Sequence, residues 1–77
     1  MIFERLAAFI EDIFELEEHF VTPSTRFEED LGADLPDRIE LSMLIEEEFD
    51  VLIDDEDLKR MQTVGDMVEY IRAHSDD

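Results

Sequence analysis

The sequence predicts a small all-α protein, a four-helix bundle with three main helices, one short helix and a long first loop. Apolar residues recur at intervals of three and four along several segments, which is the period of an amphipathic helix. No stretch alternates apolar and polar residues as a half-buried strand would. With 77 residues the chain has room for one domain, and we expect a folded core over 1–72 and a flexible tail over 73–77.

The first predicted helix covers residues 2–16 and is followed by a long loop. One helical face is formed by apolar residues mostly three or four apart, namely Ile2, Leu6, Phe9, Ile10, Ile13 and Leu16. Residues 17–34 lack this period and contain Pro23 and Gly32, which indicates a loop. Because so long a loop is uncommon in a small domain, we expect its apolar residues to turn inward. These are Phe20, Val21, Phe27 and Leu31.

The second main helix is predicted over residues 36–49. Asp34 or Leu35 is expected to cap it, Pro36 suits the first helical turn, and Asp37 lies near the positive end of the helix dipole. A proline crowds the residue before it and disfavours helical geometry there. We therefore expect the helix to begin at Pro36 rather than at Leu35.

Two further helices are predicted in the second half of the chain. A short helix over 54–60 should place Leu58 and Met61 inward. Thr63 is expected to cap a last helix over 64–73, because an acid stands three residues on, as in a capping box. The core face of this last helix is formed by Val64, Met67, Val68 and Ile71.

The charge of the chain restricts its partners. Twenty-four acidic residues against six basic ones give a net charge of −18, spread along the whole sequence. This field repels nucleic acid and favours encounter with basic protein surfaces, and it also favours a monomer. No apolar run approaches the roughly 18 residues that span a membrane, so we expect no membrane insertion. The absence of cysteine and of a signal-peptide pattern fits a cytoplasmic protein.

The sequence contains few residues that suggest a metal site or a catalytic site. Asp30, Gly32, Asp34 and Glu40 superficially suggest a calcium loop, but the glycine comes too early for an EF-hand. We therefore expect no specific metal site. The two histidines are isolated in the sequence and are interpreted as solvated. Because nothing indicates a cleft for acid–base catalysis, we expect the protein not to be an enzyme.

Several strings resemble acyl carrier proteins. The family reads DLGADSLD before an acidic helix, where this chain has DLGADLPD at 30–37 and EEEFD at 46–50. The string IDDEDLKRMQTVGDMVEYI at 53–71 resembles the third helix, the TV turn and the fourth helix of the family. The resemblance covers residues 2–71 without an insertion or deletion. It implies an acyl-carrier-protein-like bundle that works in fatty-acid or related lipid metabolism.

The resemblance fails at the position that carries the family's cofactor. In the family the serine of DSL accepts the 4′-phosphopantetheine arm of coenzyme A, whereas Leu35 stands at this position here. The reaction needs a hydroxyl oxygen, which leucine lacks, so no cofactor is expected. Ser42 is a weak alternative attachment site. It is interpreted instead as exposed or bonded to the helix backbone, because mid-helix amides are already paired.

The resemblance also implies a surface that docks basic patches on the enzymes or assembly proteins of acyl metabolism. Arg38 departs from the family pattern and would add a positive charge to this surface. The matching positions are Asp34, Leu35, Asp37, Arg38, Ile39, Glu40, Met43, Glu46 and Glu47. The alternative is a solvated acidic face with Ile39 and Met43 in the core.

Three functions stay open at this point. The first is an adaptor or regulator that docks without the arm. The second is a genuine acyl carrier, modified at another residue or altered here from a natural serine, for which 4′-phosphopantetheine would be the cofactor. The third is a degenerate relative with no partner.

In the family an acyl cavity lies between the second helix and the other helices. The corresponding residues are interpreted most simply as a packed core, with a bound free fatty acid as the alternative. They are Phe27, Leu41, Ile45, Phe49, Ile53, Met61, Val64 and Val68.

Overall fold

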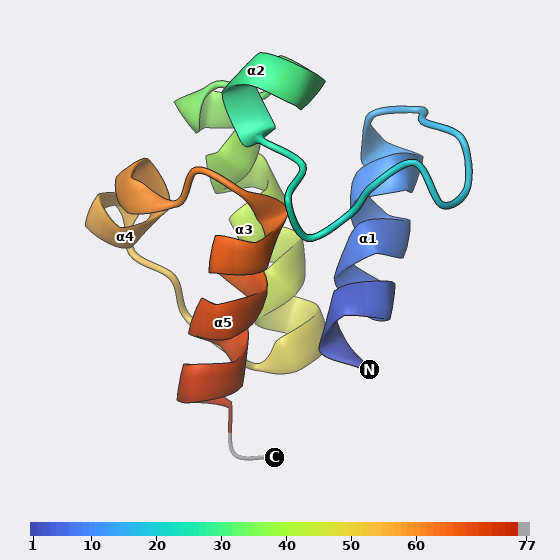
Figure 1. Ribbon diagram of the computed structural model, residues 1–77. Helices are drawn as coiled ribbons and strands as arrows, with labels where there is room; N and C mark the ends of the chain where they lie inside the picture. The colour runs from blue at the N-terminus through green and yellow to red at the C-terminus, as the bar shows by residue number, and fades with distance from the viewer. Residues whose placement is uncertain (76–77) are drawn as a thin grey trace.

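The computed structural model describes residues 1–75, which form helices joined by one long loop and short connections (Figure 1). α1 runs in one direction, α3 and α5 return in the other, and α2 and α4 lie at the end and side of this group. The elements are α1 (Ile2–Ile13), α2 (Phe27–Leu31), α3 (Leu35–Phe49), α4 (Asp55–Arg60) and α5 (Val64–His74). The predicted all-α class is confirmed, with no strand among residues 1–75. None of the helices in this range could cross a bilayer.

α1 ends at Ile13, three residues before the predicted end. Glu15 adopts a left-handed backbone with φ of 55°. The N–H groups of Glu15 and Leu16 then donate to the carbonyls of Asp12 and Glu11 at 3.3 and 2.7 Å. This pattern closes a helix in a Schellman motif. The apolar period extends past the end because Leu16 still packs against the core, so periodicity alone overestimated the helix.

α2 interrupts the segment that was predicted to be a loop throughout. Its start is fixed by Asp30, whose carboxylate accepts a hydrogen bond from the Arg26 N–H at 2.8 Å. Gly32 ends the helix with φ of 65°, a left-handed conformation that glycine adopts without strain. The prediction of a loop over Phe27–Leu31 was wrong because five residues are too few to show a helical period.

The long loop buries most of the apolar residues that were predicted to face inward. Val21 and Phe27 are buried and Leu31 is half-buried. Phe20 is 51% exposed, so the prediction for Phe20 was wrong. The neighbouring Val21 takes the inward position instead, where its N–H donates to the Glu11 carboxylate of α1 at 3.1 Å.

α3 begins at Leu35, so the prediction of a start at Pro36 was wrong. Asp34 is the cap, and its Oδ1 accepts a hydrogen bond from the Asp37 N–H at 3.2 Å. In the first turn of a helix the N–H groups have no intrahelical acceptor, so Pro36 loses no bond there. The cap outweighs the crowding of Leu35 by the proline. The end of α3 at Phe49 agrees with the prediction.

α4 and α5 follow the prediction closely. Asp54 caps α4, and Thr63 and Asp66 form a complete capping box at the start of α5. α5 continues to His74, one residue beyond its predicted end and inside the stretch 73–77 that was expected to be a tail. Residues 76–77 of that expected tail lie outside the described residues. The inward positions are all buried, namely Leu58, Met61, Val64, Met67, Val68 and Ile71.

The long loop is fastened to the first turn of α5. The N–H groups of Val64 and Gly65 donate to the carbonyls of Thr25 and Pro23 at 2.9 and 2.8 Å. A Cβ atom on Gly65 would lie 2.8 Å from the Pro23 carbonyl oxygen, so a side chain there would push the loop away. Glycine at this position therefore allows two distant segments to approach.

Candidate functional site

An apolar stripe runs along the outward side of α3. Leu35, Ile39 and Met43 follow one another at intervals of four residues, which aligns their side chains on one helix face. Leu35 and Ile39 are half-buried and pack against the core, whereas Met43 is 61% exposed. The alternative that placed Met43 in the core was therefore wrong. The stripe thus has half-buried side chains near the start of α3 and an exposed one near its middle.

Acidic side chains flank and continue this stripe. Asp34, Glu40, Glu46 and Glu47 are exposed and Asp37 is half-buried. Among residues 1–75, no ion pair involves any of these carboxylates. We call the five acids and the stripe together the acidic α3 surface; its members are Asp34, Leu35, Asp37, Ile39, Glu40, Met43, Glu46 and Glu47.

The basic residues of the chain are engaged by other acids. Each lysine and arginine forms an ion pair, and in most pairs the two residues are three or four positions apart in the sequence. The pairs are Arg5–Glu48, Arg26 with Glu29 and Asp30, Arg38–Glu28, Lys59–Glu56, Arg60–Asp57 and Arg72–Glu69. The negative charge of the acidic α3 surface is therefore not neutralised by the described part of the chain.

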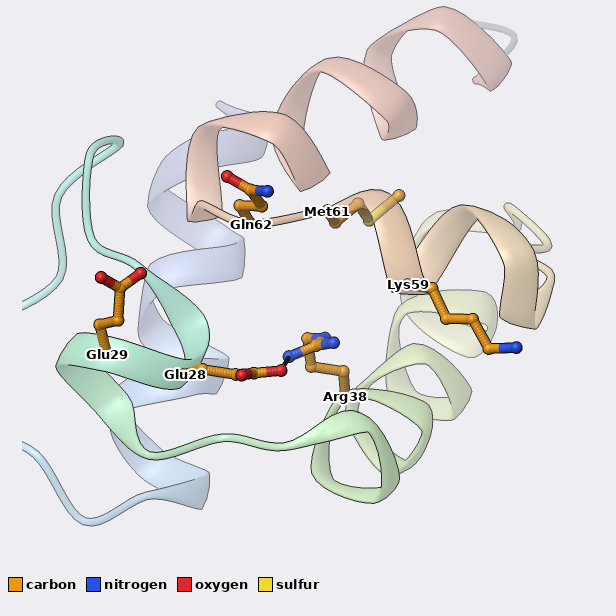
Figure 2. A pocket seen from close by; sticks show the side chains of 6 residues that line it. All are labelled: Glu28, Glu29, Arg38, Lys59, Met61 and Gln62. Atoms are coloured by element: carbon orange, nitrogen blue, oxygen red, sulfur yellow. Dashed lines mark hydrogen bonds and ion pairs between the residues drawn. The ribbon is translucent and has the colours of Figure 1, made fainter.

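Arg38 does not belong to the exposed surface. Its side chain is 5% exposed, and its Nη1 donates to the Ala33 carbonyl at 2.9 Å and to the Glu28 carboxylate at 3.4 Å. The expectation that Arg38 adds positive charge to the docking face was wrong, because the side chain turns inward toward Glu28 of α2 (Figure 2). The sequence spacing indicates this burial, because Arg38 precedes the buried Leu41 and Ile45 by three and seven residues and so lies on the same helix face.

The start of α3 does not fit a covalently attached phosphopantetheine. Leu35 is the first helical residue, and neither Leu35 nor its neighbours Asp34 and Pro36 carries a hydroxyl group. The alternative residue Ser42 is 9% exposed, and its Oγ donates to the Ile39 carbonyl at 2.6 Å. Ser42 is thus bonded to the helix backbone, as interpreted from the sequence, and its oxygen is poorly placed to attack a soluble substrate.

The residues that match the family's acyl cavity lie together in the core. Six of the eight are buried, and Phe49 and Ile53 are half-buried and pack against them. This is the arrangement expected of the simpler interpretation, a packed interior. The buried six are Phe27, Leu41, Ile45, Met61, Val64 and Val68.

Other residues considered in the sequence lie apart from the acidic α3 surface. Asp30 belongs to α2, where a hydrogen bond from the Arg26 side chain lowers the pKa of its carboxyl group. His74, near the C-terminal end of α5, stacks on the Tyr70 ring with centroids 3.9 Å apart. His19 is exposed in the long loop. The structure therefore does not bring these groups together into a site.

A pocket that the sequence did not reveal lies between α2, α3 and the segment joining α4 to α5 (Figure 2). Its volume is about 220 Å³. Sequence reasoning missed most of its residues because nothing in the pattern indicates that α2 lies beside the end of α4. The lining residues are Glu28, Glu29, Arg38, Lys59, Met61 and Gln62.

Comparison with known proteins agrees with the helical fold. Residues 4–71 match the model of the family described as the phosphopantetheine attachment site. The chain is also similar to a solved structure of the acyl carrier protein from Enterococcus faecalis, with a TM-score of 0.80 and 34% sequence identity. The match covers 96% of this chain and 94% of that chain. The resemblance inferred from the sequence strings is confirmed.

Proposed function

The chain belongs to the phosphopantetheine attachment site family, and from that premise we propose that it is an acyl-carrier-like docking protein without the phosphopantetheine arm. In this role it serves fatty-acid or related lipid metabolism as an adaptor or regulator, and it acts as a cytoplasmic monomer. Acyl carrier proteins are carriers and not enzymes, so family membership agrees with the expectation of no catalytic activity. The observation that carries the proposal is the acidic α3 surface, whose charge is not neutralised by residues 1–75 and whose apolar stripe begins at Leu35.

Leu35 supports a role without the arm. The start of a helix favours a bound anion, which suits a phosphodiester, but an attached arm needs an oxygen on the side chain. Leucine supplies none. Its side chain instead extends the apolar stripe that continues through Ile39 and Met43. The position that carries the arm in the family thus becomes part of the apolar contact area here.

The unpaired acids support docking to a basic partner. No ion pair among residues 1–75 has to break before Glu40, Glu46 or Glu47 meets a lysine or arginine of the partner. Complementary charge of this kind speeds the encounter of two proteins and selects the partner. Because exposed charges are screened by salt, binding should weaken as the ionic strength rises.

The test is binding to a phosphopantetheinyl transferase or a ketoacyl synthase, measured with Glu40 and Glu46 both reversed to lysine. We expect this double variant to lose affinity by about tenfold or more, since two charge pairs become repulsive. The matched control reverses Glu4 and Glu17, which are exposed and lie outside α3. The control changes net charge equally. Unchanged binding of the α3 variant, or an equal loss in the control, would contradict docking through α3.

A genuine carrier is the alternative function, and intact-mass spectrometry separates the two. After incubation with coenzyme A and a broad-specificity transferase, we expect no phosphopantetheine adduct on the natural chain. The Leu35→Ser variant, which supplies the missing hydroxyl, should gain one adduct in the same reaction. An adduct on the natural chain would show that another residue is modified and would overturn the proposal.

A further inference from the structure

The pocket beside α2 contains a buried cation that the protein satisfies incompletely. The Arg38 side chain is 5% exposed. It makes two hydrogen bonds, both from Nη1, which donates to the Ala33 carbonyl and to the Glu28 carboxylate. Its Nε is buried and has no hydrogen-bond partner among residues 1–75. A guanidinium group only donates, and buried donors are nearly always paired in folded proteins. The described chain therefore leaves the Nε–H of Arg38 as an unsatisfied donor.

Only one charged side chain of this pocket faces the guanidinium group. Figure 2 shows Glu28 and Arg38 pointing toward one another from α2 and α3, while Glu29 and Lys59 point away. Glu29 pairs with Arg26 at 2.9 Å, and Lys59 pairs with Glu56 at 3.2 Å. The charge around Arg38 is thus set by Glu28.

The contact with Glu28 is weak enough to be exchanged. Its N–O distance of 3.4 Å exceeds the roughly 2.7–2.9 Å of a strong charge-assisted hydrogen bond. The Glu28 side chain is 67% exposed, so it can leave the pocket without disturbing the core. Glu28 bonds to Nη1, so the other edge of the guanidinium, formed by Nε and Nη2, has no acceptor among residues 1–75, and the negative charge of Glu28 opposes a carboxylate there.

We propose that this pocket binds a small monocarboxylate. One ligand oxygen accepts from the Nε–H of Arg38 and the other from the adjacent Nη2–H, while the Glu28 carboxylate moves into solvent. This planar, two-bond pairing is the geometry in which arginine recognises carboxylates. A pocket of about 220 Å³ is smaller than those that hold drug-sized ligands, so it suits a small ligand such as acetate. Because Arg38 lies on the inner side of α3, this site does not depend on docking through the acidic α3 surface.

The test follows the Nε–H signal of Arg38 by NMR while sodium acetate is added to the full chain at neutral pH. We expect a saturable shift of this signal, with an affinity in the millimolar range. Sodium chloride at the same ionic strength should not produce it. A shift that does not saturate, or an equal shift with chloride, would overturn the proposal, since either result means a general salt effect.

A pair of variants tests the role of Glu28. Glu28→Gln removes the competing carboxylate, and we expect acetate to bind about two- to fivefold more tightly, the range expected for an exposed ion pair. Glu29→Gln changes the net charge equally, but its side chain points away, so it should have little effect. Unchanged binding by Glu28→Gln, or equal gains in both variants, would contradict a carboxylate bound to Arg38 beside Glu28.

The Arg38→Lys variant tests the two-bond geometry. A lysine keeps the positive charge but loses the planar fork, so we expect the acetate response to disappear. The response is then followed at the backbone amide of Gln62, which also lines the pocket. Circular dichroism checks that the variant is folded. A folded variant that binds acetate as the natural chain does would contradict the proposed contact.

Discussion

The inner and outer sides of α3 differ in how deeply their side chains are buried and in whether their charges are paired. On the inner side, Leu41 and Ile45 are fully buried and even the charged Arg38 is enclosed. On the outer side, Met43 is 61% exposed, and Glu40 and Glu47 have no ion pair within residues 1–75. One helix can thus hold the fold together with one face and keep unpaired charge on the other. Substitutions should therefore separate folding from binding along this single element.

The largest expected effect comes from emptying the inner side. Ile45→Ala should lower the free energy of unfolding by about 2–5 kcal/mol, because it removes buried methyl groups and leaves a cavity. Met43→Ala, two residues away on the exposed stripe, should cost less than about 0.5 kcal/mol. Urea unfolding measures both values. Similar losses in the two variants would mean that the sides of α3 are not as different as the structure indicates.

A smaller change in stability, in this case a gain, is expected from a substitution on the outer side. The last turn of α3 contains acids and no basic residue, so its charges oppose the negative end of the helix dipole. Glu47→Lys should raise the free energy of unfolding by about 0.3–1 kcal/mol while weakening partner binding. Thermal unfolding at low and high salt provides the check, since salt should reduce the gain. A loss of stability at low salt would show that Glu47 has a structural role.

The smallest expected effect is a change in the pKa of Asp30. This acid is paired with Arg26, whereas the acids on the outer side of α3 have no ion pair among residues 1–75. The side-chain hydrogen bond from Arg26, followed by the one from its backbone N–H, lowers the pKa of the Asp30 carboxyl group. A carboxyl whose folded pKa is depressed stabilises the protein above its unfolded pKa and loses this contribution as pH falls through the folded pKa. Arg26→Gln should therefore raise the pKa of Asp30, which an NMR titration of the carboxyl carbon measures. An unchanged pKa would mean that the ion pair does not persist in solution.

The sequence predicted the elements whose determinants are local. Thr63 and Asp66 form their capping box within four residues, so the start of α5 could be located without a structure. α4 begins one residue after its predicted start, and its cap is also local, because the Asp54 side chain accepts from the Asp57 N–H. The strings shared with acyl carrier proteins gave the fold and the family. The acidic α3 surface could be anticipated because its residues lie on one helix.

The missed features depend on contacts between distant parts of the chain. The enclosure of Arg38 requires Ala33 and Glu28 to be placed by α2, a helix too short to show a period. Arginine is also treated as a surface residue by default, which hid its position in register with the buried Leu41. The exposure of Phe20 depends on which of two adjacent apolar residues reaches α1. Neither the enclosure of Arg38 nor the exposure of Phe20 can be predicted from hydrophobic spacing alone.

The fastening of the long loop to α5 has a consequence for the motions of the protein. In the first turn of a helix the amide hydrogens have no intrahelical acceptor, yet Val64 and Gly65 donate to the carbonyls of Thr25 and Pro23. Their exchange with solvent deuterium therefore requires the loop to detach, whereas the amides of Val68 and Ile71 exchange only when α5 itself opens. Two separate opening rates can thus be observed on one helix. The faster of them would report how often the loop leaves the bundle.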